Sequence, residues 1–251
     1  MKMFSSAVMA LFLGVGGPAL ALEVCFEGAY PPFSEVRDDG TLVGFDIDIA
    51  RALCGQIGET CDFVQTNWSE MIPSLTGKRC DAIIASMSDT PERRARIDFT
   101  KPYYRSPVRF VGPATGVAGS DWPGGHPIGV QLGTVNQTYM DVHFPGTPLR
   151  LYGNQEHLLL DLYAGRVDAV LGEAAQLDTG FLRTPAGEGF AFLGSPMFDP
   201  AIQGAGAAIG VRKDDAALRD RLDAGLDAIR ASGAYREISL RYFGEDISEG
   251  G

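Results

Sequence analysis

The sequence predicts an α/β protein with two lobes of similar construction, each built on a doubly wound, mostly parallel sheet with helices on both faces. Segments typical of strands and of helices alternate along residues 22–111, and this alternation is characteristic of parallel sheets. A stretch rich in Gly, Pro, Ala, Ser and Asp at residues 112–127 separates this first half from a second half in which strand-like and helix-like segments again alternate. The two halves also share a pattern at residues 75–83 and 162–170, in which Gly and a basic residue precede Asp-Ala at the start of a strand.

We expect lobe 1 to comprise residues 22–110 and 208–251 and lobe 2 to comprise residues 111–207. The glycine-rich segment at residues 204–210 superficially resembles a dinucleotide-binding loop. It has Ile209 at the sixth position and no helix pattern directly after it, unlike the cofactor-binding fingerprint. We therefore interpret it as the strand that returns the chain to lobe 1.

The N-terminus has the features of a cleaved export signal. Lys2 is followed by an apolar run at residues 7–15 and by an A-x-A cleavage site at residues 19–21. The apolar run is shorter than the roughly 20 residues that a membrane-spanning helix needs. We therefore expect residues 1–21 to be a signal peptide that is removed on export. Cys25 lacks the preceding small residue that lipidation requires, so no lipid anchor is expected.

Composition and motifs exclude several classes of function. Hydrophobic residues make up 45% of the chain and charged residues 21%, which is typical of a globular protein. The formal net charge of −11 argues against a nucleic-acid partner, because a phosphate backbone requires a basic surface. The sequence contains no G-x-S-x-G, P-loop or H-E-x-x-H motif, and its three histidines are scattered. No nucleophile–base pair can be named from these residues.

All four cysteines lie in the part of the chain expected to be exported, where an oxidising environment favours disulfides. Cys54 and Cys61 flank a predicted helix end and turn, and we expect them to form a disulfide. Cys25 and Cys80 each lie near the start of a strand and are compatible with buried thiols or with a second bridge. No C-x-x-C pair is present, so no zinc site is expected.

The most informative stretch begins with the apolar run A-I-I-A and continues through S-M-S-D-T-P-E-R-R. The run predicts a buried strand, and Asp89 or Thr90 followed by Pro-Glu predicts the start of a helix. Ser86, Ser88 and Arg93 therefore lie where a strand ends and a helix begins. Free backbone amides, hydroxyls and a guanidinium together suit a small carboxylate. A capped helix with a solvated arginine explains the same residues without a ligand.

Two further loops of lobe 1 carry side chains suited to a ligand. Glu27 and Tyr30 follow the first predicted strand, and Trp68 follows the second. Open α/β sheets bind ligands at such strand ends, although a surface acid and packing aromatics account for the same residues. Asp46 precedes an amphipathic helix, and we expect it to cap that helix rather than to bind a metal.

Lobe 2 repeats this arrangement. A Gly-containing turn begins at Gln131, after a short strand, and leads into a helix near Thr134 and Asn136. Glu173 ends a later strand of the same lobe. Because the strand ends of two similar lobes deliver polar groups, we expect a ligand to bind in the cleft between them.

Several longer motifs occur together in the chain. They are YPPF followed by GFDIDIARALC, then IPSLTGKRCDAIIASMSDTPERR with IDFTKPYY, and later AGRVDAV. In combination they resemble the periplasmic polar-amino-acid-binding proteins of ABC importers (solute-binding proteins of family 3), nearest to the histidine- and lysine/arginine/ornithine-binding proteins. The resemblance covers nearly all of the expected mature chain. It implies a two-lobe, type II periplasmic-binding-protein fold and is consistent with a disulfide between Cys54 and Cys61.

The resemblance also implies a role for each candidate residue. Arg93 matches the arginine that holds the ligand α-carboxylate, with help from Ser88 and from the turn at Thr134. Glu173 matches an aspartate that receives the α-ammonium. Glu27 matches an acid that pairs with a cationic ligand side chain. Tyr30 and Trp68 match the aromatic or apolar pair that sandwiches that side chain. Ser86, Gln131 and Asn136 match polar residues that line the pocket.

The chain departs from the family pattern at three of these positions or their neighbours. Glu replaces Asp at Glu27 and Glu173, and Val135 stands where a hydroxyl is common. Arg93 and Glu173 complement a zwitterion, so the third charge, Glu27, is unpaired unless the ligand carries an additional positive charge. We therefore expect the ligand to be arginine, lysine, ornithine, histidine or an opine.

The family resemblance implies a monomer without a cofactor, which closes around its ligand and docks on an inner-membrane ABC permease from the periplasm. Hinges are expected near residues 108–112 and 204–211. The alternative is a periplasmic cyclohexadienyl dehydratase, an enzyme that also resembles these proteins, with Glu173 as general acid toward prephenate or arogenate. A sensor-type ligand-binding domain is a third interpretation and would require a separate signalling partner.

Overall fold

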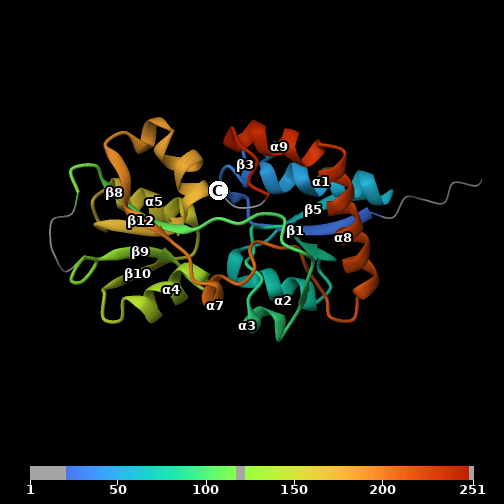
Figure 1. Ribbon diagram of the computed structural model, residues 1–251, viewed down its shortest axis with the longest axis horizontal. Coiled ribbons are helices and arrows are strands. Elements are labelled where there is room, and N and C mark those ends of the chain that lie inside the picture. The colour runs from blue at the N-terminus through green and yellow to red at the C-terminus, as the bar shows by residue number, and fades with distance from the viewer. Residues whose placement is uncertain (1–20, 117–121, 249–251) are drawn as a thin grey trace, which may run out of the picture.

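The computed structural model describes residues 21–116 and 122–248, which form two α/β lobes (Figure 1). The predicted signal peptide lies outside these residues except for Ala21, which begins the first strand. Within the described residues, no helix combines the length and the apolar character needed to cross a bilayer.

Lobe 1 contains a five-stranded sheet. Its strand order is β5 (Thr60–Gln65), β1 (Ala21–Phe26), β6 (Ala82–Ile83), β13 (Gly210–Val211) and β7 (Asp98–Phe99). β1 pairs in parallel with β5 and β6, whereas β13 runs antiparallel to β6 and β7. The expected return strand near residue 210 is therefore present, and it runs against its neighbours.

Helices cover both faces of this sheet (Figure 1). They are α1 (Phe45–Ile57), α8 (Ala216–Ala231) and α9 (Ala234–Phe243) on one face, and η1 (Trp68–Glu70), α2 (Met71–Thr76) and α3 (Pro91–Arg94) toward the other. The alternation of β1 explains both cores, because Leu22 and Val24 pack with α1 and α8 while Cys25 packs with Met71 of α2.

Lobe 2 is built in the same way. Its sheet has the order β10 (Leu149–Tyr152), β9 (Ile128–Gln131), β11 (Ala169–Glu173), β8 (Val108–Pro113) and β12 (Phe190–Met197). Its helical segments are α4 (Val135–His143), α5 (Gln155–Tyr163), α6 (Ala174–Leu177), η2 (Asp178–Leu182), η3 (Pro185–Gly187) and α7 (Pro200–Gln203). β10, β9 and β11 are parallel, and β8 pairs antiparallel with both β11 and β12.

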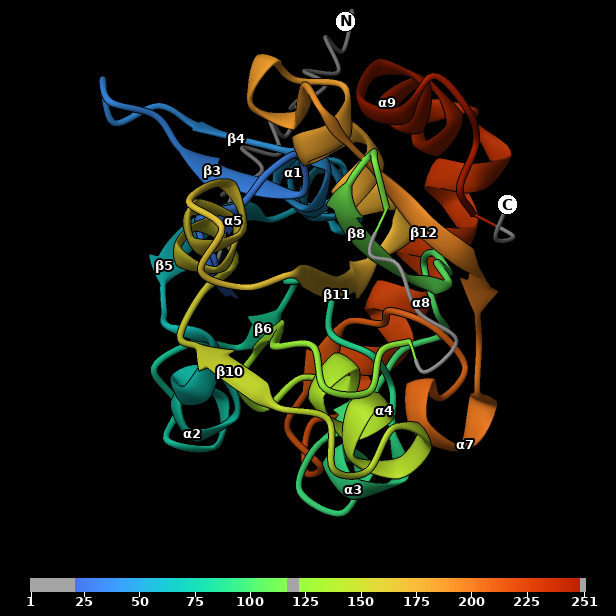
Figure 2. The ribbon, with the colours of Figure 1, turned by 90° about the vertical axis from the view of Figure 1, so that its left-hand side faces the viewer.

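A small antiparallel sheet of β2 (Ala29–Tyr30), β3 (Ser34–Val36) and β4 (Leu42–Val43) extends from lobe 1 beside α5 of lobe 2 (Figure 2). The chain passes between the two large sheets in the connections from β7 to β8 and from β12 to β13. The predicted boundary between residues 110 and 111 and the hinge range 108–112 therefore fall inside β8, a strand of lobe 2. The change of lobe occurs earlier, between β7 and β8, because β8 pairs with β11 and β12 of lobe 2.

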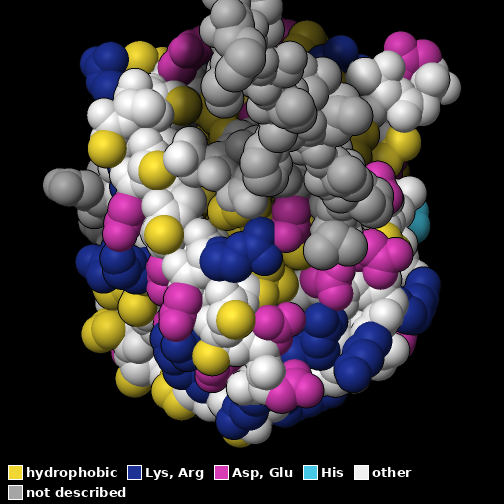
Figure 3. Space-filling view, turned by 90° about the vertical axis from the view of Figure 1, so that its right-hand side faces the viewer, with side chains coloured by type: hydrophobic (Ala, Val, Ile, Leu, Met, Phe, Trp, Pro, Cys, Tyr) yellow, Lys and Arg dark blue, Asp and Glu magenta, His cyan; other side chains and the backbone are white. Residues whose placement is uncertain are grey.

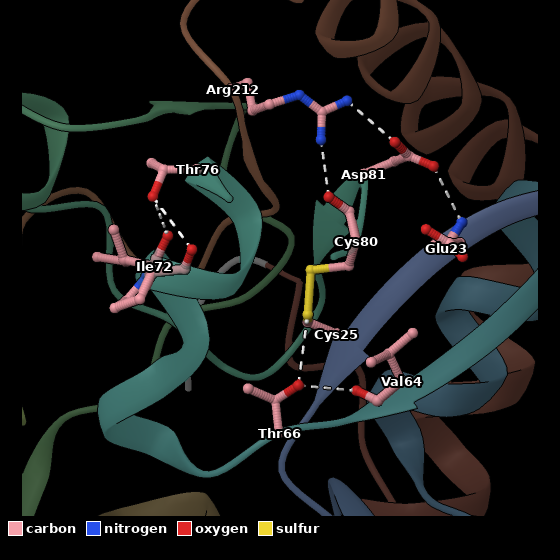
Figure 4. Close-up of a disulfide and its surroundings, with 10 residues drawn as sticks. Glu23, Cys25, Val64, Thr66, Ile72, Thr76, Cys80, Asp81 and Arg212 are labelled. Atoms are coloured by element: carbon pink, nitrogen blue, oxygen red, sulfur yellow. Dashed lines mark hydrogen bonds and ion pairs between the residues drawn. A yellow bond between two sulfur atoms is a disulfide. The ribbon is translucent and has the colours of Figure 1, made fainter. Parts of the chain in front are cut away.

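Two disulfides are present in lobe 1. One joins Cys54 at the end of α1 to Cys61 in β5, and the other joins Cys25 of β1 to Cys80 just before β6. The sequence left the second pair open between thiols and a bridge. Around it, Arg212 donates to the Cys80 carbonyl and to Asp81 (Figure 4). The bridge and the arginine thus attach the start of β6 to both β1 and β13.

Charged side chains of both signs are interspersed on the exposed end of lobe 1. Figure 3 shows basic and acidic groups alternating over the described part of this face. No single-sign patch dominates that visible part.

Candidate functional site

The ten side chains singled out from the sequence line one cavity between the two lobes. Ala85 and Val135 complete its wall. The ten residues are Glu27, Tyr30, Trp68, Ser86, Ser88, Arg93, Gln131, Thr134, Asn136 and Glu173. They come from elements far apart in the sequence, so only the folded chain brings them together.

Parallel strands explain why these residues meet. In lobe 1, Glu27 directly follows β1, Trp68 begins η1 after β5, and Ser86 follows β6. In lobe 2, Gln131 and Glu173 are the last residues of β9 and β11. Neighbouring parallel strands end at the same edge of a sheet, and the two sheets face each other at these edges.

Arg93 reaches the cavity from α3, whose start was predicted correctly. The Thr90 hydroxyl accepts from the Arg93 backbone amide (3.3 Å), and Pro91 occupies the first turn. The guanidinium donates to the Ser88 carbonyl (2.9 Å) and, across the cleft, to the Gly133 carbonyl (3.3 Å). Burial lowers the pKa of Arg93 to about 10, which leaves it cationic at neutral pH.

Trp68 forms the side of the cavity next to Arg93. The Arg93 guanidinium lies 5.2 Å from the centre of the Trp68 ring, a favourable cation–π geometry. The indole nitrogen of Trp68 donates to the Gly133 carbonyl of lobe 2 (3.1 Å). The Gly133 carbonyl, in the turn before α4, therefore accepts hydrogen bonds from two side chains of lobe 1, those of Trp68 and Arg93. Gly133 has a φ of +71° in this turn, a conformation that favours glycine.

Glu27 and Gln131 join the lobes on another side of the cavity. The Gln131 side-chain amide donates to the Glu27 carboxylate (2.7 Å). Burial raises the pKa of Glu27 to about 7, because the low-dielectric surroundings disfavour the charged form more than one neutral hydrogen bond stabilises it. No lysine, arginine or histidine of the described residues forms an ion pair with Glu27.

Glu173 is held by two tyrosines of lobe 1. The Tyr104 hydroxyl donates to it at 2.8 Å and the Tyr30 hydroxyl at 3.3 Å. Burial again raises the pKa of this carboxyl to about 7, opposed by the two hydrogen bonds and by the positive charge of Arg93. Tyr104 was not singled out from the sequence, because an aromatic residue in F-T-x-P-Y-Y gives no sign of its acidic partner.

Asp46 does not cap α1, contrary to expectation. Gly44 occupies the N-cap position, and Asp46 lies in the first turn with its side chain fully buried. Its carboxylate accepts from the Tyr103 hydroxyl (2.8 Å) and from the Ser86 hydroxyl (2.9 Å). In the sequence, an acid at the start of a helix looks the same whether it caps the helix or turns inward to buried hydroxyls, so the sequence alone did not distinguish these two roles.

The lobes are closed on one another around this cavity. The cavity volume is only about 30 Å³. A wider groove of about 1060 Å³ lies between the β2–β4 sheet and α5 and contains none of the ten residues. The described residues contain no cluster of three or more side chains suited to a metal ion. The charged groups that line the cavity are one guanidinium, that of Arg93, and the two buried carboxyl groups of Glu27 and Glu173.

This geometry agrees with what comparison with known proteins finds. A family model, "Bacterial extracellular solute-binding proteins, family 3", matches residues 22–245. An L-arginine-binding protein from Pseudomonas aeruginosa is 38% identical over 231 residues, which cover 90% of this chain and 89% of that protein. The histidine-binding periplasmic protein of Escherichia coli K12 is 35% identical over 225 residues, which cover 88% and 86%. These relatives are named as binding proteins, so the enzyme interpretation is the weaker one.

Solved structures agree on the fold. A periplasmic binding protein of Salmonella typhimurium with high arginine specificity superposes with a TM-score of 0.83 at 30% identity, over 90% of this chain and 100% of that one. A Silicibacter pomeroyi protein of the His/Glu/Gln/Arg/opine family, solved with lysine, gives 0.79 at 29%, over 90% and 98%. Because the family model covers nearly all of the chain and the relatives match over most of their length, this protein belongs to the bacterial extracellular solute-binding proteins, family 3.

Proposed function

We propose that this protein binds a basic amino acid between its lobes and presents it to an ABC permease. The observation that carries this proposal is the charge of the cavity, in which Arg93 faces the two buried carboxyl groups of Glu27 and Glu173. A zwitterionic amino acid supplies one negative and one positive charge. Arg93 and Glu173 complement those two charges, and Glu27 then requires a second positive charge on the ligand.

The uncharged groups of the cavity favour a ligand rich in N–H donors. The side-chain oxygen of Asn136 is buried and accepts no hydrogen bond from the described residues. A buried acceptor without a donor costs about 1–3 kcal/mol, so a ligand that donates to it gains that difference. Tyr30 and Trp68 supply flat apolar surfaces suited to the methylene groups of a long side chain.

Relatives support the same class of ligand. The names of two of them specify arginine and histidine, and a third is a lysine/arginine/ornithine-binding protein of Escherichia coli that is 35% identical over 222 residues. We infer from the sequence of residues 1–21 that the protein reaches the periplasm through a cleaved signal peptide without lipidation. We further infer that it acts as a monomer, with the inner-membrane permease as its partner.

A thermal-shift screen of ligand-stripped protein tests the proposal. The ligands are arginine, lysine, ornithine, histidine, their opines, glutamine and glutamate. A ligand at 100 times its Kd stabilises the folded protein by about 2.7 kcal/mol, which raises the melting temperature visibly. We expect a shift with basic ligands and little with glutamate. A shift with glutamate or glutamine alone would contradict the basic-ligand assignment, and no shift with any of them would contradict the binding function.

A further inference from the structure

A buried ring of hydrogen bonds lies directly behind the cavity and involves three residues. Asp46 of α1 accepts from the Tyr103 hydroxyl at one carboxylate oxygen (2.8 Å) and from the Ser86 hydroxyl at the other (2.9 Å). The Ser86 backbone amide donates to the Tyr103 oxygen (3.0 Å), which closes the ring. Asp46 and Tyr103 are fully buried, and only Ser86 also lines the cavity.

The ring holds Ser86 in a conformation that serine rarely adopts. Its φ is +53°, in the left-handed region that disfavours residues with a Cβ. Tyr103 is itself fixed, because its amide donates to Ala207 (2.8 Å) and its carbonyl accepts from the Tyr235 hydroxyl (2.6 Å). The ring therefore fixes both the backbone and the hydroxyl of Ser86.

The ring also sets the direction of the Ser86 hydroxyl. Burial raises the pKa of Asp46 to about 7. Above that pH the carboxylate is ionised and only accepts hydrogen bonds, so the hydroxyl proton of Ser86 must point at Asp46. The lone pairs of the same oxygen are then the part that remains available to the cavity. They accept hydrogen bonds and repel a carboxylate. A serine hydroxyl without such a partner could either donate or accept a hydrogen bond in the cavity, because it rotates to suit its partner.

The position of the ring indicates which end of the ligand it serves. Tyr103 of the ring is next to Tyr104, with their ring centroids 5.2 Å apart, and the Tyr104 hydroxyl donates to Glu173 (2.8 Å). Glu27 lies on the side of Gln131 instead. The oxygen of Ser86 therefore belongs to the Glu173 end of the cavity, where the proposed function places the α-ammonium.

We propose that Asp46 is a positioning residue of the binding site, which fixes Ser86 as a hydrogen-bond acceptor for the ligand α-ammonium. This inference rests on the proposed function and adds to it a residue that does not touch the ligand. It gives a role to a fully buried acid whose side-chain hydrogen-bond donors, Tyr103 and Ser86, are both uncharged.

The decisive variant is Asp46→Asn. The amide keeps the shape of the carboxylate and can still accept from Tyr103, but its NH2 group donates to Ser86. The Ser86 hydroxyl proton is then turned toward the cavity, where it opposes an ammonium. Titration calorimetry at pH 8 compares the basic amino acid that wild type binds most tightly with its α-hydroxy acid analogue, which lacks the ammonium. We expect Asp46→Asn to reduce the preference for the amino acid by about tenfold or more.

Three further variants separate positioning from folding. Ser86→Ala should reduce the same preference, and Asp46→Asn should add little to it in the Ser86→Ala background. Asp48→Asn is the matched control, because Asp48 lies in the same turn but pairs with Arg51 and Arg241 away from the cavity, and it should leave the preference unchanged.

The outcomes distinguish the two proposals. If wild type binds no basic amino acid, the proposed function is wrong and this inference falls with it. If wild type binds one but Asp46→Asn weakens both ligands by the same factor, Asp46 supports only the fold and the inference alone is wrong. If Asp46→Asn does not fold, Ser86→Ala still decides, because an unchanged preference in that variant overturns the role of Ser86 as acceptor.

Discussion

At the scale of single residues, the behaviour of the cavity depends on two buried acids, neither of which forms an ion pair with another of the described residues. Glu27 and Glu173 are each 8% exposed, and their hydrogen-bond donors are neutral side chains. A buried carboxylate without an ion-pair partner is costly, so the pKa of each acid is raised to about 7, although the positive charge of Arg93 lowers that of Glu173. A cationic ligand changes this balance, and the consequences can be measured at each residue.

Glu27→Gln tests the acid assigned to the ligand side chain. The amide keeps the size of the side chain but cannot pair with a cation, and a hydrogen bond to a charged group contributes about 1.5–3 kcal/mol. We expect the Kd for arginine, measured by calorimetry at pH 8, to rise by roughly 10- to 150-fold. The control is Glu35→Gln on β3, outside the cavity. Unchanged arginine affinity in Glu27→Gln would refute the charge-pairing argument.

The pH dependence of binding follows from the same acids. Burial raises the pKa of both Glu27 and Glu173 from 4.5 to about 7 in the ligand-free protein. A cationic ligand binds the ionised forms, so we expect affinity to rise from pH 5.5 to pH 8 and then to level off. Binding near pH 7 should release protons, which calorimetry in buffers of different ionisation enthalpy detects. Affinity that falls over this range would contradict the assignment.

The stability of the ligand-free protein should show the opposite trend. Each acid has a higher pKa in the folded than in the unfolded state, so its contribution to stability is complete below pH 4.5 and is lost as the pH rises through about 7. Saturating arginine should reduce this loss, because it pairs with the ionised forms. Melting temperatures measured between pH 5 and pH 8, with and without arginine, check both statements.

The sequence could name half of the cavity residues because they end a strand or closely follow one, and strand ends are visible in the alternation of apolar and turn segments. Asp46 was misassigned for a physical reason. Its partners, Ser86 and Tyr103, lie 40 and 57 residues further along the chain. No local pattern separates an acid that caps a helix from one that turns inward to a distant hydroxyl. Tyr104 escaped notice for the same reason, since its partner Glu173 is 69 residues away.

At the scale of elements, the apolar segments and their order predicted the two sheets and the helices on both faces. The antiparallel strands were harder to predict. β13 has only two residues, and its partners β6 and β7 are equally short. β8 is a clear strand in the sequence, but its lobe is decided by pairing with β11 and β12, which follow much later. Register and edge selection depend on these distant partners.

The two disulfides should stabilise lobe 1 to different extents. Cys25 and Cys80 are separated by 55 positions and Cys54 and Cys61 by 7. In the chain-entropy model a cross-link stabilises more when it closes a longer loop, by about 4 kcal/mol for the first and about 2.5 kcal/mol for the second. We expect Cys25→Ala with Cys80→Ala to lower the free energy of unfolding in urea more than Cys54→Ala with Cys61→Ala. The reverse order would mean that native packing, rather than loop closure, decides their contributions.

At the scale of the whole molecule, the two lobes are connected by two chain segments that pair with each other. Ala207 accepts from the Tyr103 amide (2.8 Å) and donates to the Tyr104 carbonyl (3.0 Å). Gly204 lies beside them, where a Cβ would come within 1.7 Å of the Asp89 carbonyl. The lobes also touch through side-chain hydrogen bonds that cross the cleft: Trp68 and Arg93 to Gly133, Gln131 to Glu27, Tyr30 and Tyr104 to Glu173, and Gln176 to Pro31. A hinge motion that opens the cavity breaks such side-chain contacts, while the two connecting segments remain paired.

A further contact between the lobes tests closure without altering the cavity. Gly180 of η2 packs against Pro31 of lobe 1, and a Cβ added to it would lie 2.2 Å from the Pro31 carbonyl oxygen. Neither residue lines the cavity. Gly180→Ala should therefore hold the lobes apart, while each lobe keeps its own core. Gly55→Ala is the control, since a Cβ there meets nothing within 4 Å.

Overpacking of this kind costs about 1–3 kcal/mol, which corresponds to roughly 5- to 150-fold in Kd. We expect Gly180→Ala to weaken arginine binding within this range and to leave a larger radius of gyration in small-angle scattering at saturating arginine than wild type has. Gly55→Ala should match wild type in both measurements. Since Pro31 and Gly180 are contributed by different lobes, reduced affinity with an unchanged liganded radius would mean that the substitution perturbs lobe 2 alone. Unchanged affinity would show that binding does not require the lobes to approach as closely as they do here.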